Sequence, residues 1–353
     1  MFDMRRRAFI TLLSVAVATW PLAAHAHVKW FAEYDLYHAP LPIDEVVTGQ
    51  FLYIFLLSVF CMYVFFWLDR YALRKGILED AVRRYTVSEP VAFVVMRVAA
   101  FIFFAAIGAY GIFGHAFFLT PELKTDYRWV PWLQFVMALC ALHRYTVPLT
   151  GLGIAILYVA AITQYGVFHL LDYLILVGVS YYFLAVPMSG SSRWLMSRYL
   201  VLYATTGLTL LWASIEKWGY AIWTYPLLER EPDLLMGFDP RTYMMLAGFF
   251  EFNVTFMALS SASLLSRAVT LALFSIFLLA IVKFGMIDAV GHLLIIAILF
   301  VLIVRGPTKG RYFLVLEQKS LWTEAYFMTG LYILAFVLVF ISYYGFHFLA
   351  YGN

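Results

Sequence analysis

Long apolar runs dominate this chain and restrict it to one kind of fold. After a polar segment from His27 to Glu45, runs of membrane-spanning length follow one another almost to the end. A helix of about 20 predominantly apolar residues crosses the hydrocarbon core of a bilayer. The runs therefore predict an all-α, polytopic transmembrane bundle of ten helices. These helices are expected near residues 46–67, 91–113, 129–143, 147–165, 171–187, 199–220, 242–264, 268–286, 289–305 and 325–348.

The composition excludes several other classes of protein. Hydrophobic residues make up 64% of the 353 residues and charged residues 13%, whereas soluble domains have about 45–50% and about 25%. A single soluble core cannot hide so much apolar surface, so a soluble enzyme is excluded. A net charge of +3 without a long basic run is too small to indicate a nucleic-acid-binding protein. Cys61 and Cys140 lie in separate apolar runs, which excludes a disulfide framework.

The first 26 residues predict a cleavable export signal. Three arginines, Arg5–Arg7, precede an apolar run that closes on the cleavage pattern Ala24-His25-Ala26. The stretch Arg6–Ile10 also resembles a twin-arginine motif, which is the alternative to ordinary Sec export. Cleavage leaves His27 as the first residue, and its α-amine and imidazole together suit copper(II). The alternative is that His27 merely happens to come first.

The charges of the loops predict the orientation of the chain. Loops on one side of the predicted helices are basic and loops on the other side are acidic. Because cytoplasmic loops carry the excess of lysine and arginine, we expect a bacterial-type inner (plasma) membrane protein with residues 27–45 in the periplasm. The basic residues are Arg70, Arg74, Lys75, Arg83, Arg84, Arg144, Arg193, Arg198, Arg267, Arg305, Lys309, Arg311 and Lys319. The acidic residues are Glu33, Asp35, Asp44, Glu45, Glu122, Asp126, Glu229, Glu231, Asp233 and Asp239.

An internal repeat is expected in the middle of the chain. Polar positions recur between two groups of four helices, which would make residues 91–187 and 188–305 tandem units of the same orientation. Residues 46–90 and 306–353 would each supply a cytoplasmic loop and one flanking helix. The matched pairs are Arg97 with Arg198, His115 with Glu216, Gln134 with Glu251, His169 with Asp288, and Tyr173 with His292.

The second unit resembles the DoxX-like family of four-helix membrane proteins. The resemblance rests on Arg198, the stretch ASIEKW (Ala213–Trp218), Glu251 after Gly248, and DAVGH (Asp288–His292). It extends to Arg305, and the first unit matches more weakly. The resemblance implies a redox-linked membrane subunit, since some members are associated with quinones and with oxidation of sulfur compounds.

Ionisable residues inside the predicted helices are the candidates for chemistry. Each costs roughly 2.5–3.5 kcal/mol to insert and usually faces the bundle interior. The candidate catalytic residues, for proton or charge transfer, are Glu216, Lys217, Glu251 and Asp288. We expect Lys217 to reach Glu251 or Asp288, and Glu216 to reach Lys283 or a metal. Asp288 and His292 are four residues apart on one helix face, so the carboxylate can orient the imidazole. The alternative is a structural network of salt bridges that fixes helix register. Arg97 and Arg198 are expected to reach the lipid interface.

Histidines concentrate on the side that we expect to be periplasmic. Six of the seven histidines that remain after cleavage lie there, and His143 lies opposite, where we expect it to cap a helix. Imidazole suits copper and zinc, and the amino-terminal chelate puts copper first. The candidate metal ligands are His27, His38, His115, His169 and His292. The alternative is that helix-end histidines anchor at the headgroup level or cap backbone carbonyls, as we expect for His347.

These observations favour an integral membrane redox- or metal-linked protein, an oxidoreductase or a subunit of one, whose histidine/carboxylate site opens to the periplasm. Its cofactor would be copper or a quinone, and its partners would be the bilayer and a periplasmic or membrane redox protein. One alternative is a transporter or solute channel that uses the intramembrane charges. Another is a non-catalytic membrane subunit that anchors a partner enzyme.

Overall fold

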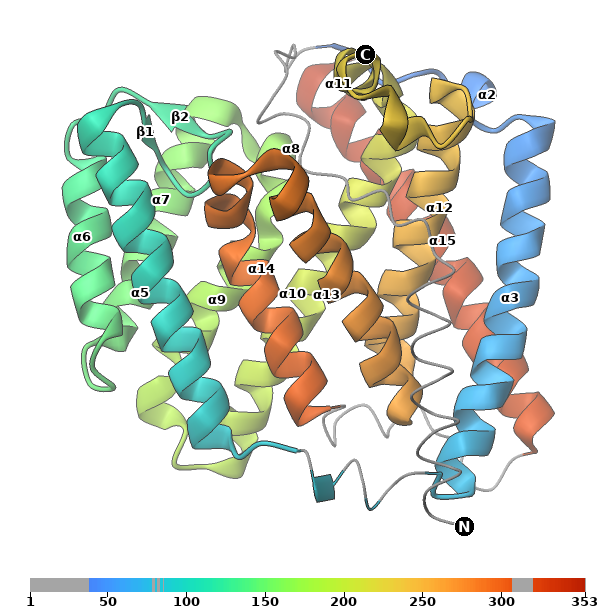
Figure 1. The fold of residues 1–353 in the computed structure, drawn as a ribbon, viewed down its shortest axis with the longest axis horizontal. Helices are drawn as coiled ribbons and strands as arrows, with labels where there is room; N and C mark the ends of the chain where they lie inside the picture. The colour runs from blue at the N-terminus through green and yellow to red at the C-terminus, as the bar shows by residue number, and fades with distance from the viewer. Residues whose placement is uncertain (1–37, 78–79, 81–82, 85, 307–319, 353) are drawn as a thin grey trace.

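The computed structural model describes residues 38–352 apart from 78–79, 81–82, 85 and 307–319. Within these residues the protein is a helical bundle, and a helix lies at each of the ten expected positions (Figure 1). The long helices are α3 (Gly49–Arg74), α5 (Glu89–Phe113), α6 (Val130–Ala141), α7 (Val147–Tyr165), α9 (Leu174–Leu184), α10 (Ser192–Gly219), α12 (Pro240–Ser260), α13 (Leu264–Phe284), α14 (Met286–Arg305) and α15 (Leu321–Tyr351). The shorter helices are α2 (Ile43–Val46), α8 (Val167–Leu170), α11 (Ala221–Arg230) and the 3-10 turns Leu171–Tyr173, Val186–Met188 and Pro232–Leu235.

Polar side chains fix where several helices begin. The Thr48 hydroxyl accepts from the Phe51 backbone N–H at 3.3 Å and caps α3, and Asp239 accepts from Thr242 N–H at 3.0 Å and caps α12. Ser320 caps α15 in the same way. Each contact satisfies one of the backbone donors that a helix start leaves open.

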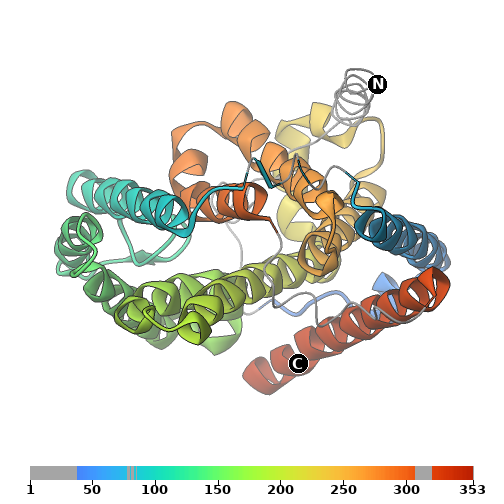
Figure 2. The same ribbon diagram turned by 90° about the horizontal axis from the view of Figure 1, so that it is seen from below.

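Eight helices form a closed ring. Each contacts the next in the order α5, α6, α7, α9, α10, α12, α13 and α14, and α14 returns to contact α5. Figure 2 shows the ring along its axis, with α14 and α10 drawn close to each other across it. The first four helices correspond to the first expected unit and the last four to the second.

The flanking helices α3 and α15 pack on each other outside the ring. They join it along α12 and α10, through a core that includes Met62, Phe66 and Phe336. A polar contact crosses this apolar seam, because Asn253 on α12 donates to Ser58 on α3 at 2.9 Å and accepts from the Tyr332 hydroxyl on α15 at 2.7 Å. Hydrogen bonds of this kind hold membrane helices in register.

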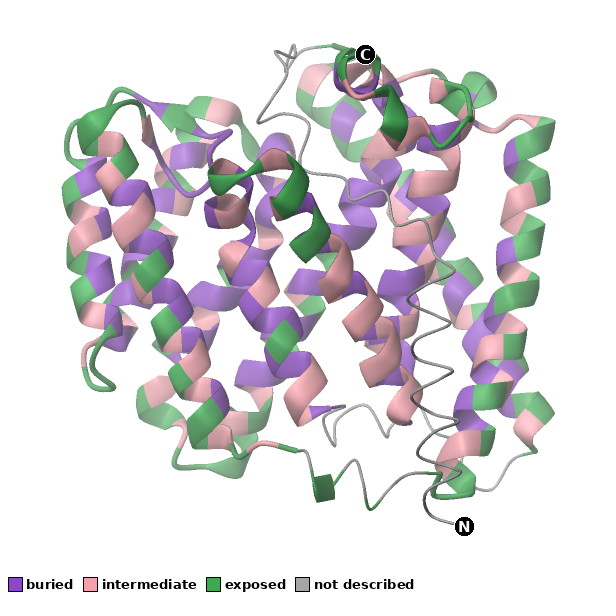
Figure 3. Cartoon of the chain, viewed as in Figure 1, coloured by how far each residue is buried: buried purple, intermediate pink, exposed green. Residues whose placement is uncertain are grey.

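The outside of the bundle is apolar. Leu56, Phe60, Val159 and Val282 are among the exposed large side chains, and Figure 3 shows buried residues on the helix faces that meet their neighbours. Eight of the helices described are long and apolar enough to cross a membrane. A soluble protein could not keep such a surface in water, so this is a multi-pass integral membrane protein in contact with the lipid bilayer.

The two ends of the bundle differ. The hairpin end carries the antiparallel strands β1 (Ala116–Phe117) and β2 (Lys124–Thr125) together with α11 (Figure 1). Residues 38–46 lie at this end too, because Leu41 N–H donates to the Gly219 carbonyl at 2.7 Å and the Tyr344 hydroxyl donates to Leu41 at 3.0 Å. The opposite end, which we call the arginine end, holds Arg70, Arg198, Arg267 and Arg305 among others.

Both four-helix groups make the same turn before their last helix. Gly166, between α7 and α8, has φ +80°, and Gly285, between α13 and α14, has φ +78°. Only glycine adopts such backbone conformations without strain. The two glycines are 119 residues apart, which is the offset at which the sequence aligns Tyr165 with Phe284. The matching turns are therefore consistent with the expected repeat.

Candidate functional site

A buried carboxylate, imidazole and phenol meet at the hairpin end. His169 Nε2 on α8 lies 2.6 Å from Glu122 Oε1, and the Tyr173 hydroxyl donates to Glu122 Oε2. All three residues are buried, with His169 only 4% exposed. The Tyr165 ring stacks on the His169 imidazole with centroids 5.7 Å apart. We call Glu122, His169 and Tyr173 the first-unit triad.

The β-hairpin places Glu122 in this position. Its strands pair, and Gln134 donates its amide to the Phe117 and Phe118 carbonyls at 2.5 and 3.0 Å. On the other side the Tyr165 hydroxyl donates to the Lys124 carbonyl at 2.7 Å. The loop that carries Glu122 is thus tied to α6 and to α7, which keeps the carboxylate folded back onto His169.

The second unit carries a matching pair on one helix. Asp288 and His292 are both buried on α14, and Asp288 Oδ1 lies 3.1 Å from His292 Nδ1. This is the pairing that their spacing predicts. Asp288 Oδ2 is buried and accepts no hydrogen bond from the described residues. The Phe277 ring lies 5.0 Å from the imidazole and closes its apolar side.

Lys217 on α10 and Glu251 on α12 form an ion pair. Glu251 was one of the two partners expected for Lys217. Both side chains are slightly exposed, at 18% and 17%. Glu216 is half-buried at the same end of α10 as Lys217. Of the four candidate catalytic residues, Lys217 and Glu251 therefore contact each other.

The candidate metal ligands are not brought together. His38 and His115 are exposed, while His169 and His292 are buried against different carboxylates. No three His, Cys, Asp or Glu side chains converge as a metal-binding group anywhere in the described ranges. His27 and the signal segment lie outside those ranges.

Lys283 departs from its expected partner. It binds Glu231 at 2.6 Å and Asp233 at 2.9 Å rather than Glu216. Its hydrogen bond lowers the pKa of Asp233 below the ordinary value. The turn after α11 brings these two carboxylates over the end of α13, an approach that the sequence pattern does not reveal.

The expectation that His347 anchors the chain at the headgroup level is wrong. It is fully buried among Phe168, Tyr220 and Tyr351, with ring centroids 5.2, 6.0 and 4.9 Å away. Helix α15 runs on to Tyr351 and packs against α8, so this histidine faces the bundle rather than lipid.

Arg198 does not reach the lipid interface either. It is 2% exposed and donates from Nε to the Tyr182 carbonyl at 2.9 Å. Arg97 remains half-buried and donates to the Ala141 and Leu142 carbonyls at the end of α6. His143 accepts from Tyr145 N–H at 3.4 Å in the exposed turn between α6 and α7, so its side chain caps a turn residue rather than a helix.

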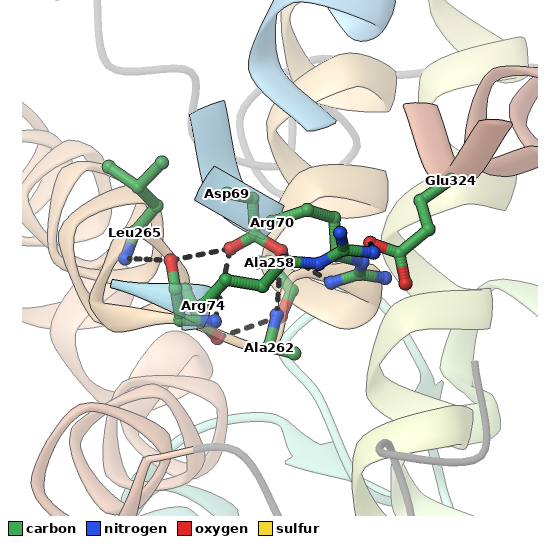
Figure 4. A network of polar contacts seen from close by, with 9 residues as sticks. Asp69, Arg70, Arg74, Ala258, Ala262, Leu265 and Glu324 are labelled. Carbon is green, nitrogen blue, oxygen red and sulfur yellow. Dashed lines mark hydrogen bonds and ion pairs between the residues drawn. The ribbon is translucent and has the colours of Figure 1, made fainter. Parts of the chain in front are cut away.

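A second buried polar network, at the arginine end, was not anticipated (Figure 4). Asp69 accepts from Ala262 N–H at 3.1 Å and from Ser263 N–H at 3.0 Å, and Arg70 contacts it at 2.6 Å. Arg74 binds Glu324 of α15 at 2.9 Å. Because Asp69 and Arg70 neutralise each other, α3 continues two turns beyond the expected end at residue 67. This network joins α3 to the start of α13 and to α15, so it has a structural role.

The arrangement at the hairpin end suits proton exchange. A carboxylate that faces an imidazole on one oxygen and a phenol on the other can accept a proton from either group. Ionisable side chains buried in membrane helices commonly form proton relays. Glu122 could have been suspected from sequence only as one more acidic loop residue, because its burial depends on the hairpin fold.

Comparison of the chain with protein-family models, with curated proteins and with solved structures found no match in any of the three. The DoxX-like resemblance thus stays a prediction from the quoted residues.

Proposed function

We propose that this protein exchanges protons at the hairpin end of the bundle in support of a redox reaction in the membrane. The observation that carries the proposal is the buried contact of Glu122 with both His169 and Tyr173. Asp288 and His292 would be the corresponding pair of the second unit, and Lys217 and Glu251 would stabilise the charges that move.

The phenol connects proton exchange with redox chemistry. If an oxidised redox partner or quinone took one electron from Tyr173, the phenol would become strongly acidic, and transfer of its proton to Glu122 would lower the cost of that electron transfer. A quinol that reached this end and was oxidised would likewise release protons, which Glu122 and His169 could accept. An oxidoreductase, or a membrane subunit of one, is therefore the class of protein that the triad supports best.

A transporter is less well supported. Transporters usually hold their substrate near the bilayer midplane between broken helices. The buried carboxylate–histidine pairs lie toward the hairpin end instead, where Glu122 contacts His169 and Asp288 contacts His292.

Infrared difference spectroscopy across a pH titration tests proton exchange by the purified protein in lipid nanodiscs. The carbonyl band of a protonated carboxylic acid should grow as the pH is lowered. Glu122→Gln and Asp288→Asn should each remove part of that band. Glu324→Gln is the matched control, since Glu324 is also buried but pairs with Arg74 at the other end. Equal bands in Glu122→Gln, Asp288→Asn and the unmodified protein would overturn the proposal.

Copper binding is a second candidate, favoured by one observation. The segment that carries exposed His38 is fastened to the hairpin end through Leu41, so the mature amino terminus would start from the end that holds the other candidate histidines. Elemental analysis with determination of the amino terminus tests it. About one copper per chain, a start at His27 and loss of copper in His27→Ala but not in His143→Ala are expected. Copper-free protein that starts at His27 would exclude it.

A further inference from the structure

Arg198 and Arg305 lie together where the two expected units meet at the arginine end. Arg198 is enclosed by aromatic rings, with its Cζ 5.1 Å from the Phe93 centroid and 4.3 Å from that of Tyr182. It donates to Ser189 Oγ at 2.9 Å and lies 3.6 Å from Glu89 Oε1. Helices α5, α9 and α10 all contribute to this enclosure.

Arg305, at the end of α14, lies against the neighbouring Tyr199. Its Cζ lies 4.4 Å from the ring centroid of Tyr199. The rings of Tyr182 and Tyr199 are 5.4 Å apart and their hydroxyls 3.3 Å apart. The two guanidinium groups therefore flank one pair of tyrosines.

These arginines keep hydrogen-bond donors that the described residues do not use. Arg198 Nη2 and Arg305 Nε are buried and have no acceptor among the residues that the structure describes. Burying an unpaired donor on a charged group is costly, and native structures rarely leave one without a ligand. Among the described contacts, Glu89 is the carboxylate that faces Arg198, so one negative charge accompanies the two positive charges of Arg198 and Arg305.

We propose that Arg198 and Arg305 bind a phosphate group at the arginine end, independently of the proton exchange proposed for the hairpin end. The planar fork of arginine matches a phosphate oxyanion, and basic pockets between transmembrane helices bind anionic headgroups. Helices α5, α10 and α14 end or begin at this level, where headgroups meet the protein. The phosphate would come from an anionic phospholipid or from free phosphate.

Native mass spectrometry of the delipidated full chain tests the proposal, with phosphatidylglycerol in one titration and inorganic phosphate in another. Arg305→Gln should weaken binding of the phosphate source by about tenfold or more, because a hydrogen bond to a charged group is lost. Arg198→Lys should also weaken it, since lysine keeps the charge without the fork. Arg144→Gln is the matched control, an exposed arginine of the same end whose guanidinium lies over Tyr145.

The two titrations distinguish the sources. Arg305-dependent binding of phosphatidylglycerol identifies a lipid headgroup, and Arg305-dependent binding of phosphate alone identifies the free anion. Equal affinities of Arg305→Gln, Arg198→Lys and Arg144→Gln for both probes would overturn the proposal. Thermal unfolding of each variant without the probes shows whether the fold is intact, and Arg198→Lys keeps the test decisive if Arg305→Gln unfolds.

Discussion

Asp69 is the residue whose contacts most clearly hold distant segments together. It accepts hydrogen bonds from the backbone N–H groups of Ala262 and Ser263, just before α13, and neutralises Arg70, and both side chains are fully buried. Removing one partner of a buried ion pair leaves an uncompensated charge, which costs about 3–5 kcal/mol.

Asp69→Ala is therefore expected to lower the free energy of unfolding by about 3–5 kcal/mol. Asp80→Ala is the control, because Asp80 pairs with Arg83 at 3.8 Å on an exposed surface, where such pairs contribute little. Denaturation followed by tryptophan fluorescence in detergent measures both. A loss no larger for Asp69→Ala than for Asp80→Ala would contradict the structural role of the network.

Asp239 gives the hairpin end a pH-dependent helix cap. The backbone N–H of Thr242 lowers the pKa of Asp239 below its ordinary value of 3.8. The cap is therefore fully effective above that value and is lost as the pH falls through the lower pKa of the folded state. Asparagine caps equally well but does not titrate.

The melting temperature of the unmodified protein should consequently fall relative to that of Asp239→Asn below about pH 4. Above that pH the carboxylate should be at least as good a cap as the amide. Calorimetry over the acid range measures the difference, and a constant difference at all pH values would show that the cap does not titrate.

At the residue scale, the sequence predicted contacts within one helix better than contacts between segments. The spacing of Asp288 and His292 placed them on one face, and they are paired. Glu122 was not selected because only the folded hairpin brings it to His169. Arg198 was expected at the lipid interface because periodicity gives no sign that Phe93 and Tyr182 enclose it.

Among the elements, the turns before α8 and α14 most strongly restrict which residue can occupy them, because each needs a glycine with positive φ. A Cβ at Gly166 or Gly285 meets no atom, but the positive φ strains any L side chain. Gly166→Ala and Gly285→Ala should each destabilise the protein by about 1–3 kcal/mol.

Gly330 provides the matched control for these substitutions. It lies inside α15, where a Cβ also meets no atom and φ is helical, so Gly330→Ala should be neutral or stabilising by about 0.5–1 kcal/mol. Thermal unfolding of the three variants is the measurement. Equal effects at all three positions would show that the turns are not strained.

The helices themselves could be located from hydropathy because lipid demands long apolar runs. Two of them depart from the simple pattern. Helix α10 is not among the eight helices that are long and apolar enough to cross a membrane. It packs against α9, α12 and α15 and carries charged residues such as Arg198 and Glu216. The helix expected near 171–187 begins with the 3-10 turn Leu171–Tyr173, which holds Tyr173 against Glu122.

The charge asymmetry between the two ends predicts the orientation of the whole molecule. If the arginine end is cytoplasmic, as the positive-inside rule predicts, the hairpin end faces the other compartment. In a variant without Cys61 and Cys140, Asp126→Cys should react with a membrane-impermeant maleimide on intact cells. Arg144→Cys should react only after permeabilisation. The reverse pattern would contradict the predicted orientation.

How the helices associate could be predicted only in part. The expected four-helix groups occur in the expected order, yet the closure of the ring through α14 and α5 and the pairing of α3 with α15 depend on side-chain packing. These contacts join residues far apart in the chain, and no periodicity within one helix specifies its neighbour. The order of the helices predicted most histidines on one side, and the spacing predicted the Asp288–His292 pair, but the contact of His169 with Glu122 could not be inferred.

Proton exchange by the buried carboxylate–imidazole pairs is tested most directly by ¹⁵N nuclear magnetic resonance of the histidine side chains in nanodiscs during a pH titration. The imidazole nitrogens of His169 and His292 should change protonation state. Glu122→Gln should alter the titration of His169 and leave that of His292 unchanged, because the two histidines contact different carboxylates. Imidazoles that keep one protonation state throughout, or a His169 titration that Glu122→Gln does not alter, would contradict the central claim.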